Sequence, residues 1–352
     1  MTEGFNVPTI DVSQWSDGDD AVRDGIAQQV DEACRSIGFM QITGHGIPPT
    51  VIDGFASAID EYFALPIDEK LALQPPRPSI NRGYAPPQSE RLSYSLGIDS
   101  PADMFEAFNV GASADDFPGL GLDDTERYGD TYASNLWPDA DAVPSFRPGV
   151  DAWFDHAGAF ARRMTSIVAR AIGLPEDFFE SFTDHSIDVL RMNNYALPPG
   201  TQLEPEQLGM GAHTDYGIVT VLWADSVPGL EILGPDGAWQ SVMPAPGALL
   251  INLGDLLQRW TNDRYISTMH RVVPPTDPEG RSIRRRSAAF FHDGNADAVI
   301  STLEPCRAAD GTSPYEDVTV DGHLTQKLTG SRGLELNQHA TREAARIVKA
   351  AT

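Results

Sequence analysis

The chain has 352 residues, of which 41% are hydrophobic, and its 51 acidic and 25 basic side chains give a formal net charge of −26. This composition allows a large core, and the acidic balance excludes nucleic acid or an anionic membrane as the main partner. Two cysteines, Cys34 and Cys306, stand at no metal-binding spacing. Together with the lack of an apolar run of membrane-spanning length, they predict a cytoplasmic protein with reduced thiols.

The first half of the chain is expected to be mainly helical. Apolar residues recur at three- or four-residue spacing over residues 22–37 and again over residues 51–62, which predicts two amphipathic helices. A short buried strand, Phe39–Ile42, is expected between them. Residues 74–148 are rich in Pro, Gly and Asp and predict a long, partly irregular covering segment. A long helix then runs from about residue 150 to residue 172.

From Ser186 onward the pattern changes to short β-rich runs separated by turn residues. Many short strands at close spacing are typical of an antiparallel barrel or jelly roll. The predicted fold is therefore mainly β with flanking helices, and the segment from Asp321 is expected to be helical again. The predicted strands are Ile187–Tyr195, Ile218–Trp223, Leu230–Leu233, Trp239–Val242, Ala248–Leu253, Met269–Val273 and Ser287–His292.

A candidate metal site comes from two histidines and a carboxylate. His213 and Asp215 lie two positions apart before a predicted strand, so both side chains project to the same side of an extended chain. His270 lies in a later predicted strand. Two histidines and one carboxylate on one face of an octahedron are the ligands of non-haem Fe(II) oxygenases. The alternative is a turn with a hydrogen-bonded Asp215 and a core histidine at position 270.

A candidate anion site follows at the start of the last predicted strand. Arg285 and Ser287 lie on one face of it, and a guanidinium with a neighbouring hydroxyl is suited to bind a carboxylate. The alternative is that Arg285 belongs to a solvated basic cluster with Arg281, Arg284 and Arg286.

The ordered set His213-x-Asp215, His270-Arg271-Val272 and Arg285-x-Ser287 is similar to the isopenicillin N synthase-like branch of the 2-oxoglutarate/Fe(II)-dependent dioxygenases. The resemblance covers most of the chain, roughly residues 7 to 328. Further segments that resemble the family are Val7–Asp11, Gly38–Pro48, Arg82–Tyr84, Asp103–Phe108 and Asn135–Pro138.

The resemblance implies a double-stranded β-helix core in which His213, Asp215 and His270 hold Fe(II). It also implies that 2-oxoglutarate chelates the iron, and that Arg285 and Ser287 bind its distal carboxylate. The implied enzyme uses dioxygen to hydroxylate, desaturate or cyclise a small organic metabolite. Two alternatives stay open, namely an oxidase that uses iron and dioxygen without 2-oxoglutarate, and a non-catalytic metal- or ligand-binding barrel.

Further residues carry weaker expectations. Tyr195 matches a family tyrosine that touches the co-substrate carboxylate, although Asn194 stands where the family more often has another tyrosine. The gap between His270 and Arg285 is longer than is usual in the family, so Arg284 and Arg286 are alternatives to Arg285. Substrate contacts are expected from Arg82, Tyr84 and Phe105. The sequence leaves substrate and oligomeric state open. The predicted regions are residues 1–180 (N-terminal helical and mixed), 181–330 (Fe(II)/2-oxoglutarate core) and 331–352 (C-terminal helix).

Overall fold

The computed structural model describes residues 6–196, 206–277, 279, 281–333 and 335–337. Its strands form an eight-stranded sheet in the order β1-β2-β10-β7-β12-β5-β4-β3, a four-stranded sheet in the order β6-β11-β8-β9, and the pair β13-β14. The strands are β1 (Thr9–Asp11), β2 (Phe39–Thr43), β3 (Gly83–Ala85), β4 (Glu106–Gly111), β5 (Val189–Tyr195), β6 (Met210–His213), β7 (Val219–Ala224), β8 (Leu230–Leu233), β9 (Trp239–Ser241), β10 (Leu249–Leu253), β11 (His270–Val272), β12 (Arg285–His292), β13 (Val299–Ile300) and β14 (Val318–Thr319).

Helices surround these sheets. They are α1 (Asp20–Ser36), α2 (Pro49–Phe63), α3 (Ile67–Leu71), α4 (Thr125–Tyr128), α5 (Phe146–Ile172), α6 (Asp255–Trp260) and α7 (Val320–Gly333), with 3-10 turns η1 (Leu92–Leu96), η2 (Ala114–Asp116), η3 (Glu180–Phe182) and η4 (Glu304–Cys306).

The barrel core is formed by the strands from β5 to β12. β5, β7, β10 and β12 lie side by side in the large sheet, while β6, β8, β9 and β11 make up the small one. The chain changes sheet at every step except between β8 and β9, which form a hairpin. This winding is that of a jelly roll, so the predicted double-stranded β-helix is confirmed.

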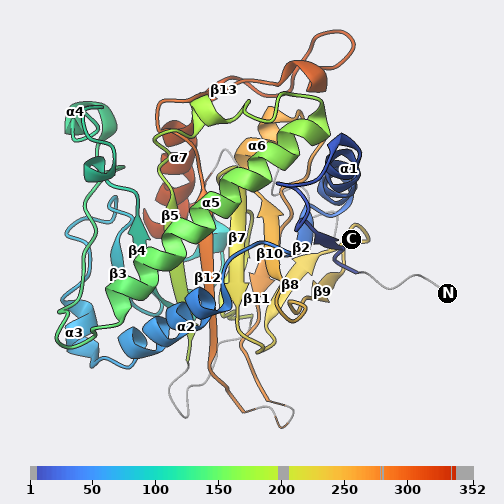
Figure 1. Cartoon of the computed structure of the whole chain (residues 1–352). Helices are drawn as coiled ribbons and strands as arrows, with labels where there is room; N and C mark the ends of the chain where they lie inside the picture. Colours follow the sequence, from blue (N-terminus) through green and yellow to red (C-terminus); the bar gives the residue numbers. More distant parts are fainter. Residues whose placement is uncertain (1–5, 197–205, 278, 280, 334, 338–352) are drawn as a thin grey trace.

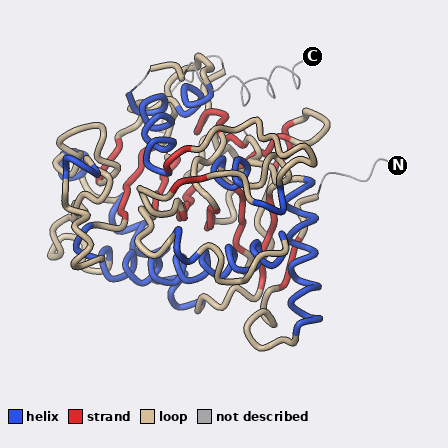
Figure 2. Tube along the Cα trace, turned by 90° about the horizontal axis from the view of Figure 1, so that it is seen from above, coloured by secondary structure: helices blue, strands red, loops and turns tan. Residues whose placement is uncertain are grey.

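The long helix α5 crosses the outer face of the large sheet, with α2 beside it (Figure 1). Seen from above, α5 lies along one side of the strands, so helices and sheets form separate layers (Figure 2). Phe55 of α2 stacks on Trp153 of α5 with ring centroids 4.8 Å apart, and both side chains are fully buried. This aromatic contact joins the two helices over the sheet.

The local sequence explains where α1 begins and ends. The Asp19 carboxylate accepts the backbone N–H of Val22, which satisfies one of the free donors of the first turn. Gly38 follows the helix with a φ of +69°, and a Cβ there would lie 2.0 Å from the carbonyl oxygen of Ile266. Glycine is therefore required at this turn, which leads the chain directly into β2.

The N-terminal region is less separate than the predicted boundary at residue 180 implies. β1 and β2 extend one edge of the large sheet, and β3 and β4 extend the other. The strands β3 and β4 lie within residues 74–148, which were expected to be irregular. At the other end, α7 runs from Val320 to Gly333, so the predicted boundary at residue 330 falls inside it, and residues 338–352 lie outside the described residues.

Candidate active site

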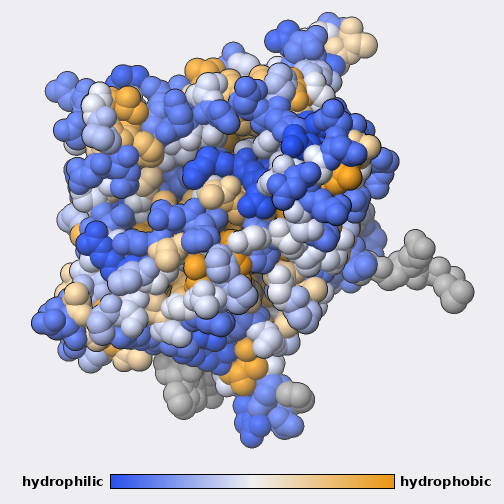
Figure 3. All heavy atoms as spheres, viewed as in Figure 1, coloured by the Kyte–Doolittle hydropathy of each residue, from blue (hydrophilic) through white to orange (hydrophobic). Residues whose placement is uncertain are grey.

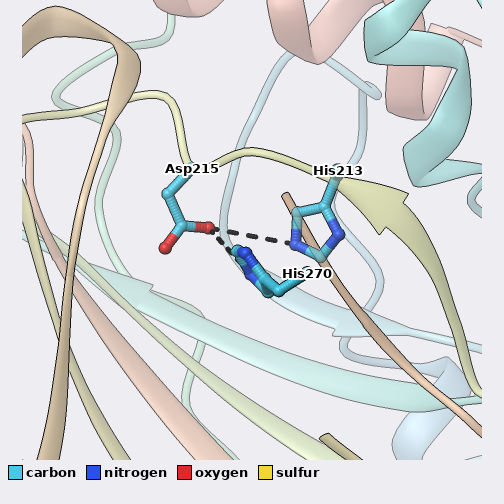
Figure 4. A group of neighbouring side chains, drawn as sticks. All are labelled: His213, Asp215 and His270. Carbon is cyan, nitrogen blue, oxygen red and sulfur yellow. Dashed lines mark ion pairs between the residues drawn. The ribbon is translucent and has the colours of Figure 1, made fainter. Parts of the chain in front are cut away.

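Two strands of the small sheet bring the three candidate metal ligands together. His213 ends β6 and His270 begins β11, and the two are register partners in the antiparallel pair. Asp215 lies in the loop after β6, and its Oδ1 atom is 3.9 Å from His213 Nε2 and 3.6 Å from His270 Nε2. The three side chains point toward one common centre (Figure 4). All three are buried.

Backbone carbonyl groups orient both imidazole rings. His213 Nδ1 lies 2.8 Å from the carbonyl oxygen of Gly211, and His270 Nδ1 lies 3.2 Å from that of Thr268. Because a carbonyl only accepts, each Nδ1 carries a proton and each Nε2 presents its lone pair to the common centre. Burial, and then the nearby His270, lower the pKa of His213 to about 3, so its ring stays neutral at physiological pH.

Two polar side chains fix the carboxylate of Asp215. Thr220 Oγ1 and Asn252 Nδ2 each donate to Oδ2 over 2.5 Å. Thr220 on β7 and Asn252 on β10 are themselves register partners. Neither residue was expected at the site from the sequence. Their donors engage Oδ2 and leave Oδ1 directed at the two histidines.

The triad forms part of the wall of a cavity. Alternate residues of β5 and β12 face this cavity, as expected for strands with one face turned inward. The inward residues of the two strands are Val189, Arg191, Asn193 and Tyr195 on β5, and Arg285, Ser287, Ala289 and Phe291 on β12.

One end of the cavity holds a guanidinium with unused donors. Arg285 is buried, and its Nε and Nη1 atoms have no hydrogen-bond partner within the part of the chain that the structure describes. Ser287 and Tyr195 line the cavity beside it. Arg284 and Arg286 point away, since each forms an ion pair with Asp60 of α2. Of the three neighbouring arginines, Arg285 is therefore the one that faces the cavity.

These features fit the groups that the sequence predicted. A buried guanidinium with free N–H donors and a neighbouring hydroxyl is the donor set for a carboxylate. Two imidazole nitrogens and one carboxylate oxygen, all within 4.8 Å of one another, are the donor set for Fe(II). Among the described residues, this is the one group of histidine, cysteine and acidic side chains found able to hold a metal ion.

The three residues expected to contact substrate lie elsewhere. The Arg82 guanidinium is buried on backbone carbonyl groups, and the Tyr84 hydroxyl donates to Glu106 over 2.5 Å. Phe105 packs against the Tyr195 ring at a centroid distance of 5.9 Å. None of the three is part of the cavity wall. Buried packing engages these side chains, together with hydrogen bonds to backbone carbonyl groups for Arg82 and to the Glu106 carboxylate for Tyr84, and contact of the three residues with substrate stays a prediction.

The opposite end of the cavity carries charged residues that the sequence did not reveal. Arg191 Nη2 lies 2.9 Å from one oxygen of Glu90, and Arg332 Nε lies 3.4 Å from the other. All three residues line the cavity. They come from β5, from the segment before η1 and from α7, so no sequence motif links them.

The surface differs from this interior. The face shown in Figure 3 is largely hydrophilic, with small separate hydrophobic areas. Within the described residues, no helix is both long enough and apolar enough to cross a membrane. The large apolar side chains that are exposed include Ile67 and Leu71 on α3, and Leu120 and Val299 elsewhere in the chain.

Comparison with known proteins agrees with this site. Residues 7–140 match the family model described as the N-terminal part of the non-haem dioxygenase in morphine synthesis, and residues 187–294 match that of the 2OG-Fe(II) oxygenase superfamily. The 2-oxoglutarate-Fe(II) type oxidoreductase hxnY of Emericella nidulans is 33% identical over 318 residues, covering 89% of this chain and 87% of the relative. Homoarginine-6-hydroxylase 2-ODD-233 of Oryza sativa is 34% identical, covering 86% and 88%.

A solved structure has the same architecture. A full-length Neurospora crassa protein, crystallised in complex with alpha-KG (2-oxoglutarate), matches with a TM-score of 0.81 and 29% identity, covering 94% of this chain and 97% of that one. The chain therefore belongs to the 2-oxoglutarate- and Fe(II)-dependent oxygenase superfamily. The order of its two family matches fits the isopenicillin N synthase-like branch. The enzyme is a dioxygenase that uses Fe(II) and 2-oxoglutarate to oxidise a small molecule.

Proposed function

We propose that His213, Asp215 and His270 hold the iron of this dioxygenase, and that Arg285 and Ser287 bind the distal carboxylate of 2-oxoglutarate. The observation that carries the proposal is the pair of unpartnered donors on the buried Arg285, in the same cavity as the triad. An unpaired buried charge is costly, so this guanidinium needs an anion. Tyr195 contributes the ring that covers the guanidinium, at 5.2 Å.

Each part of the site then has a separate task. Bound Fe(II) with 2-oxoglutarate supplies the activation of dioxygen, and the outcome at the substrate is hydroxylation, desaturation or ring closure. Thr220 and Asn252 hold the Asp215 carboxylate so that one oxygen faces the metal. The two Nδ1 hydrogen bonds orient the rings so that each Nε2 faces the common centre. The apolar inner walls exclude bulk water from the reacting atoms.

The alternative of an oxidase that works without 2-oxoglutarate makes a different stoichiometric prediction. The proposed enzyme forms one succinate for each dioxygen that it consumes, whereas the alternative forms none. The test is to measure succinate and dioxygen together with purified Fe(II) enzyme and a panel of candidate substrates. Dioxygen consumption with substrate but without succinate would overturn the co-substrate assignment.

The relatives give a range for the substrate but do not fix it. The Neurospora crassa protein has also been crystallised with thymine and with 5-formyluracil, and a rice relative is a homoarginine hydroxylase. We propose that this enzyme also acts on a small polar metabolite that fits beside 2-oxoglutarate in the cavity. We further propose a cytoplasmic location, supported by two unpaired thiols, Cys34 and Cys306. Fractionation of cells with an antibody to the chain tests that location.

A further inference from the structure

The end of the cavity away from Arg285 contains a buried cluster of three charged side chains. Glu90 lies between Arg191 and Arg332, at 2.9 and 3.4 Å, and the exposed side-chain fractions of the three are 6%, 9% and 12%. Arg191 also donates through Nε to Asn193 over 3.1 Å. Within the part of the chain that the structure describes, Glu90 is the one carboxylate at ion-pair distance from either guanidinium. Two cations therefore share one anion.

This cluster is separate from the proposed 2-oxoglutarate site. Arg285 is the register partner of Tyr195, and Arg191 precedes Tyr195 by four residues on β5. At a rise of about 3.3 Å per residue, the two arginines lie roughly 13 Å apart along the strand. The five-carbon chain of one 2-oxoglutarate molecule, already bound to Arg285 and to the metal, does not also reach Arg191. The second cationic end of the cavity is left for another ligand.

The charges in the cavity lead to the same conclusion. The two negative charges of 2-oxoglutarate, with that of Asp215, balance Fe(II) and Arg285. Arg191, Arg332 and Glu90 together leave one positive charge. Of the other buried carboxyls, Asp293 lines the cavity, and burial raises its pKa well above the ordinary value. Asp103 accepts backbone N–H groups of Leu92 and Gly211, and burial raises its pKa to about 7, so it is only a partial counter-charge. A buried net charge calls for a partner.

We propose that the substrate is a small monoanion, with a carboxylate as its acidic group, and that Arg191 and Arg332 bind that group while Glu90 balances the charge of one of the two guanidinium groups. The proposal deepens the proposed function and rests on it. The walls next to the cluster are largely apolar and would contact the uncharged body of the substrate. That body would extend toward the metal site, where the oxidised carbon lies. These wall residues are Leu92, Tyr216, Phe291, Leu324 and Leu328.

Matched acids and amides test the charge preference directly. Benzoate with benzamide, phenylacetate with phenylacetamide, and hexanoate with hexanamide differ in charge but little in shape. Binding of each is measured by calorimetry to the anaerobic Fe(II) enzyme saturated with 2-oxoglutarate. We expect at least one acid to bind about tenfold or more tightly than its amide, as for a charge-assisted hydrogen bond. If no acid binds better than its amide, the proposal is overturned.

Two variants test whether the preference for acids over amides depends on the charged cluster. Arg191→Gln should weaken the preferred acid roughly tenfold to a hundredfold and remove the preference over the amide. Glu90→Gln removes the anion that competes for the guanidinium groups, so acid binding should become tighter. A merely structural role of the cluster predicts weaker binding in both variants. An acid preference that survives Arg191→Gln, or acid binding that weakens in folded Glu90→Gln enzyme, also overturns the proposal.

Separate control measurements test whether each variant folds and whether it still binds 2-oxoglutarate. Arg191→Gln leaves Glu90 with one fewer partner, so the double variant Arg191→Gln/Glu90→Gln is included, and it should fold and show no acid preference. The binding of 2-oxoglutarate is titrated in every variant and should stay at its wild-type value, since Arg285 is untouched. An acid preference without any 2-oxoglutarate binding would refute the proposed function alone, and the reverse result would refute the present inference alone.

Discussion

Tyr195 and Arg285 face each other across the antiparallel strands β5 and β12, and the guanidinium carbon of Arg285 lies 5.2 Å from the centre of the tyrosine ring. The ring covers a charged group that has two unpartnered nitrogen atoms among the described residues. A guanidinium on an aromatic face is held in a fixed orientation by a cation–π contact. The arrangement therefore presents donors in a defined direction before any ligand arrives.

Replacement of Arg285 should weaken 2-oxoglutarate binding strongly. Loss of one partner of a buried charge pair costs about 2–5 kcal/mol, which is roughly a 30-fold to several-thousand-fold loss of affinity. Ser287→Ala should cost less, about 1.5–3 kcal/mol. Arg285→Lys should fall between wild type and Arg285→Ala, because it keeps the charge but loses the planar fork. Anaerobic titration of 2-oxoglutarate into the Fe(II) enzyme measures this order. Arg284→Ala is the matched control, since Arg284 pairs with Asp60 and Asn194 rather than facing the cavity, and an equal effect there would contradict the assignment.

Removal of any metal ligand should abolish Fe(II)-dependent turnover and leave the fold intact. His213→Ala, Asp215→Ala and His270→Ala each delete one of the three donors around the common centre. Asp215→Glu should fail as well, because the longer side chain displaces the carboxylate from the donors of Thr220 and Asn252. Iron content per chain and succinate formation are measured, with circular dichroism as the control for folding. Wild-type turnover in any one variant would show that the residue is not a ligand.

Thr220→Val should lower iron affinity without removing a ligand. The variant keeps the shape of the side chain but loses the hydroxyl that donates to Asp215 Oδ2. Loss of such an outer partner of a metal ligand costs about 10- to 100-fold in metal affinity. Thr220→Ser keeps the hydroxyl and should stay near wild type. Competition with a metal chelator gives both affinities, and equal losses in the two variants would indicate packing as the cause.

A pH effect on stability is expected from His323 in α7. Burial lowers its pKa to about 3 from the ordinary 6.5, so between these values the unfolded chain binds a proton that the folded chain does not. This difference lowers the free energy of unfolding as pH falls below 6.5, by up to about 1.4 kcal/mol per pH unit. The stability of wild type relative to His323→Gln should therefore fall between pH 6.5 and pH 5. Urea unfolding of both proteins measures it, and a constant difference would contradict the lowered pKa.

The strands that carry clear β patterns could be predicted closely from the sequence. Leu230–Leu233 was predicted to the residue, and β7, β10 and β12 were each predicted within two residues at either end. The strand β6 was missed because Met210–His213 contains Gly and Ala, which have low β-propensity. β3 and β4 were missed because they lie in a Pro- and Gly-rich segment. Their place in the sheet comes from long-range pairing, since β4 pairs with β5 and β3 pairs with β4.

The residues of the site also fall into two groups, those that the local sequence predicted and those that it did not. The residues predicted from short motifs lie at or near strand ends, where the spacing along an extended chain determines the side to which each side chain points. They are His213, Asp215, His270 and Arg285. Arg191 and Glu90 are 101 positions apart and meet only because the segment before η1 folds over β5. Local sequence patterns contain no information on such a contact. The guesses Arg82, Tyr84 and Phe105 were taken from the right segment of the chain, but their side chains do not line the cavity.

The helix α7 gives the enzyme a route by which its substrate preference can evolve. Leu324, Leu328 and Arg332 close the cavity from this one helix, whereas the metal site and Arg285 belong to the barrel. Mutations at Leu324, Leu328 and Arg332 would therefore reshape the proposed substrate chamber without replacing a residue of the proposed iron or co-substrate site. A library confined to the inward positions of α7 is accordingly the natural starting point for engineering this enzyme.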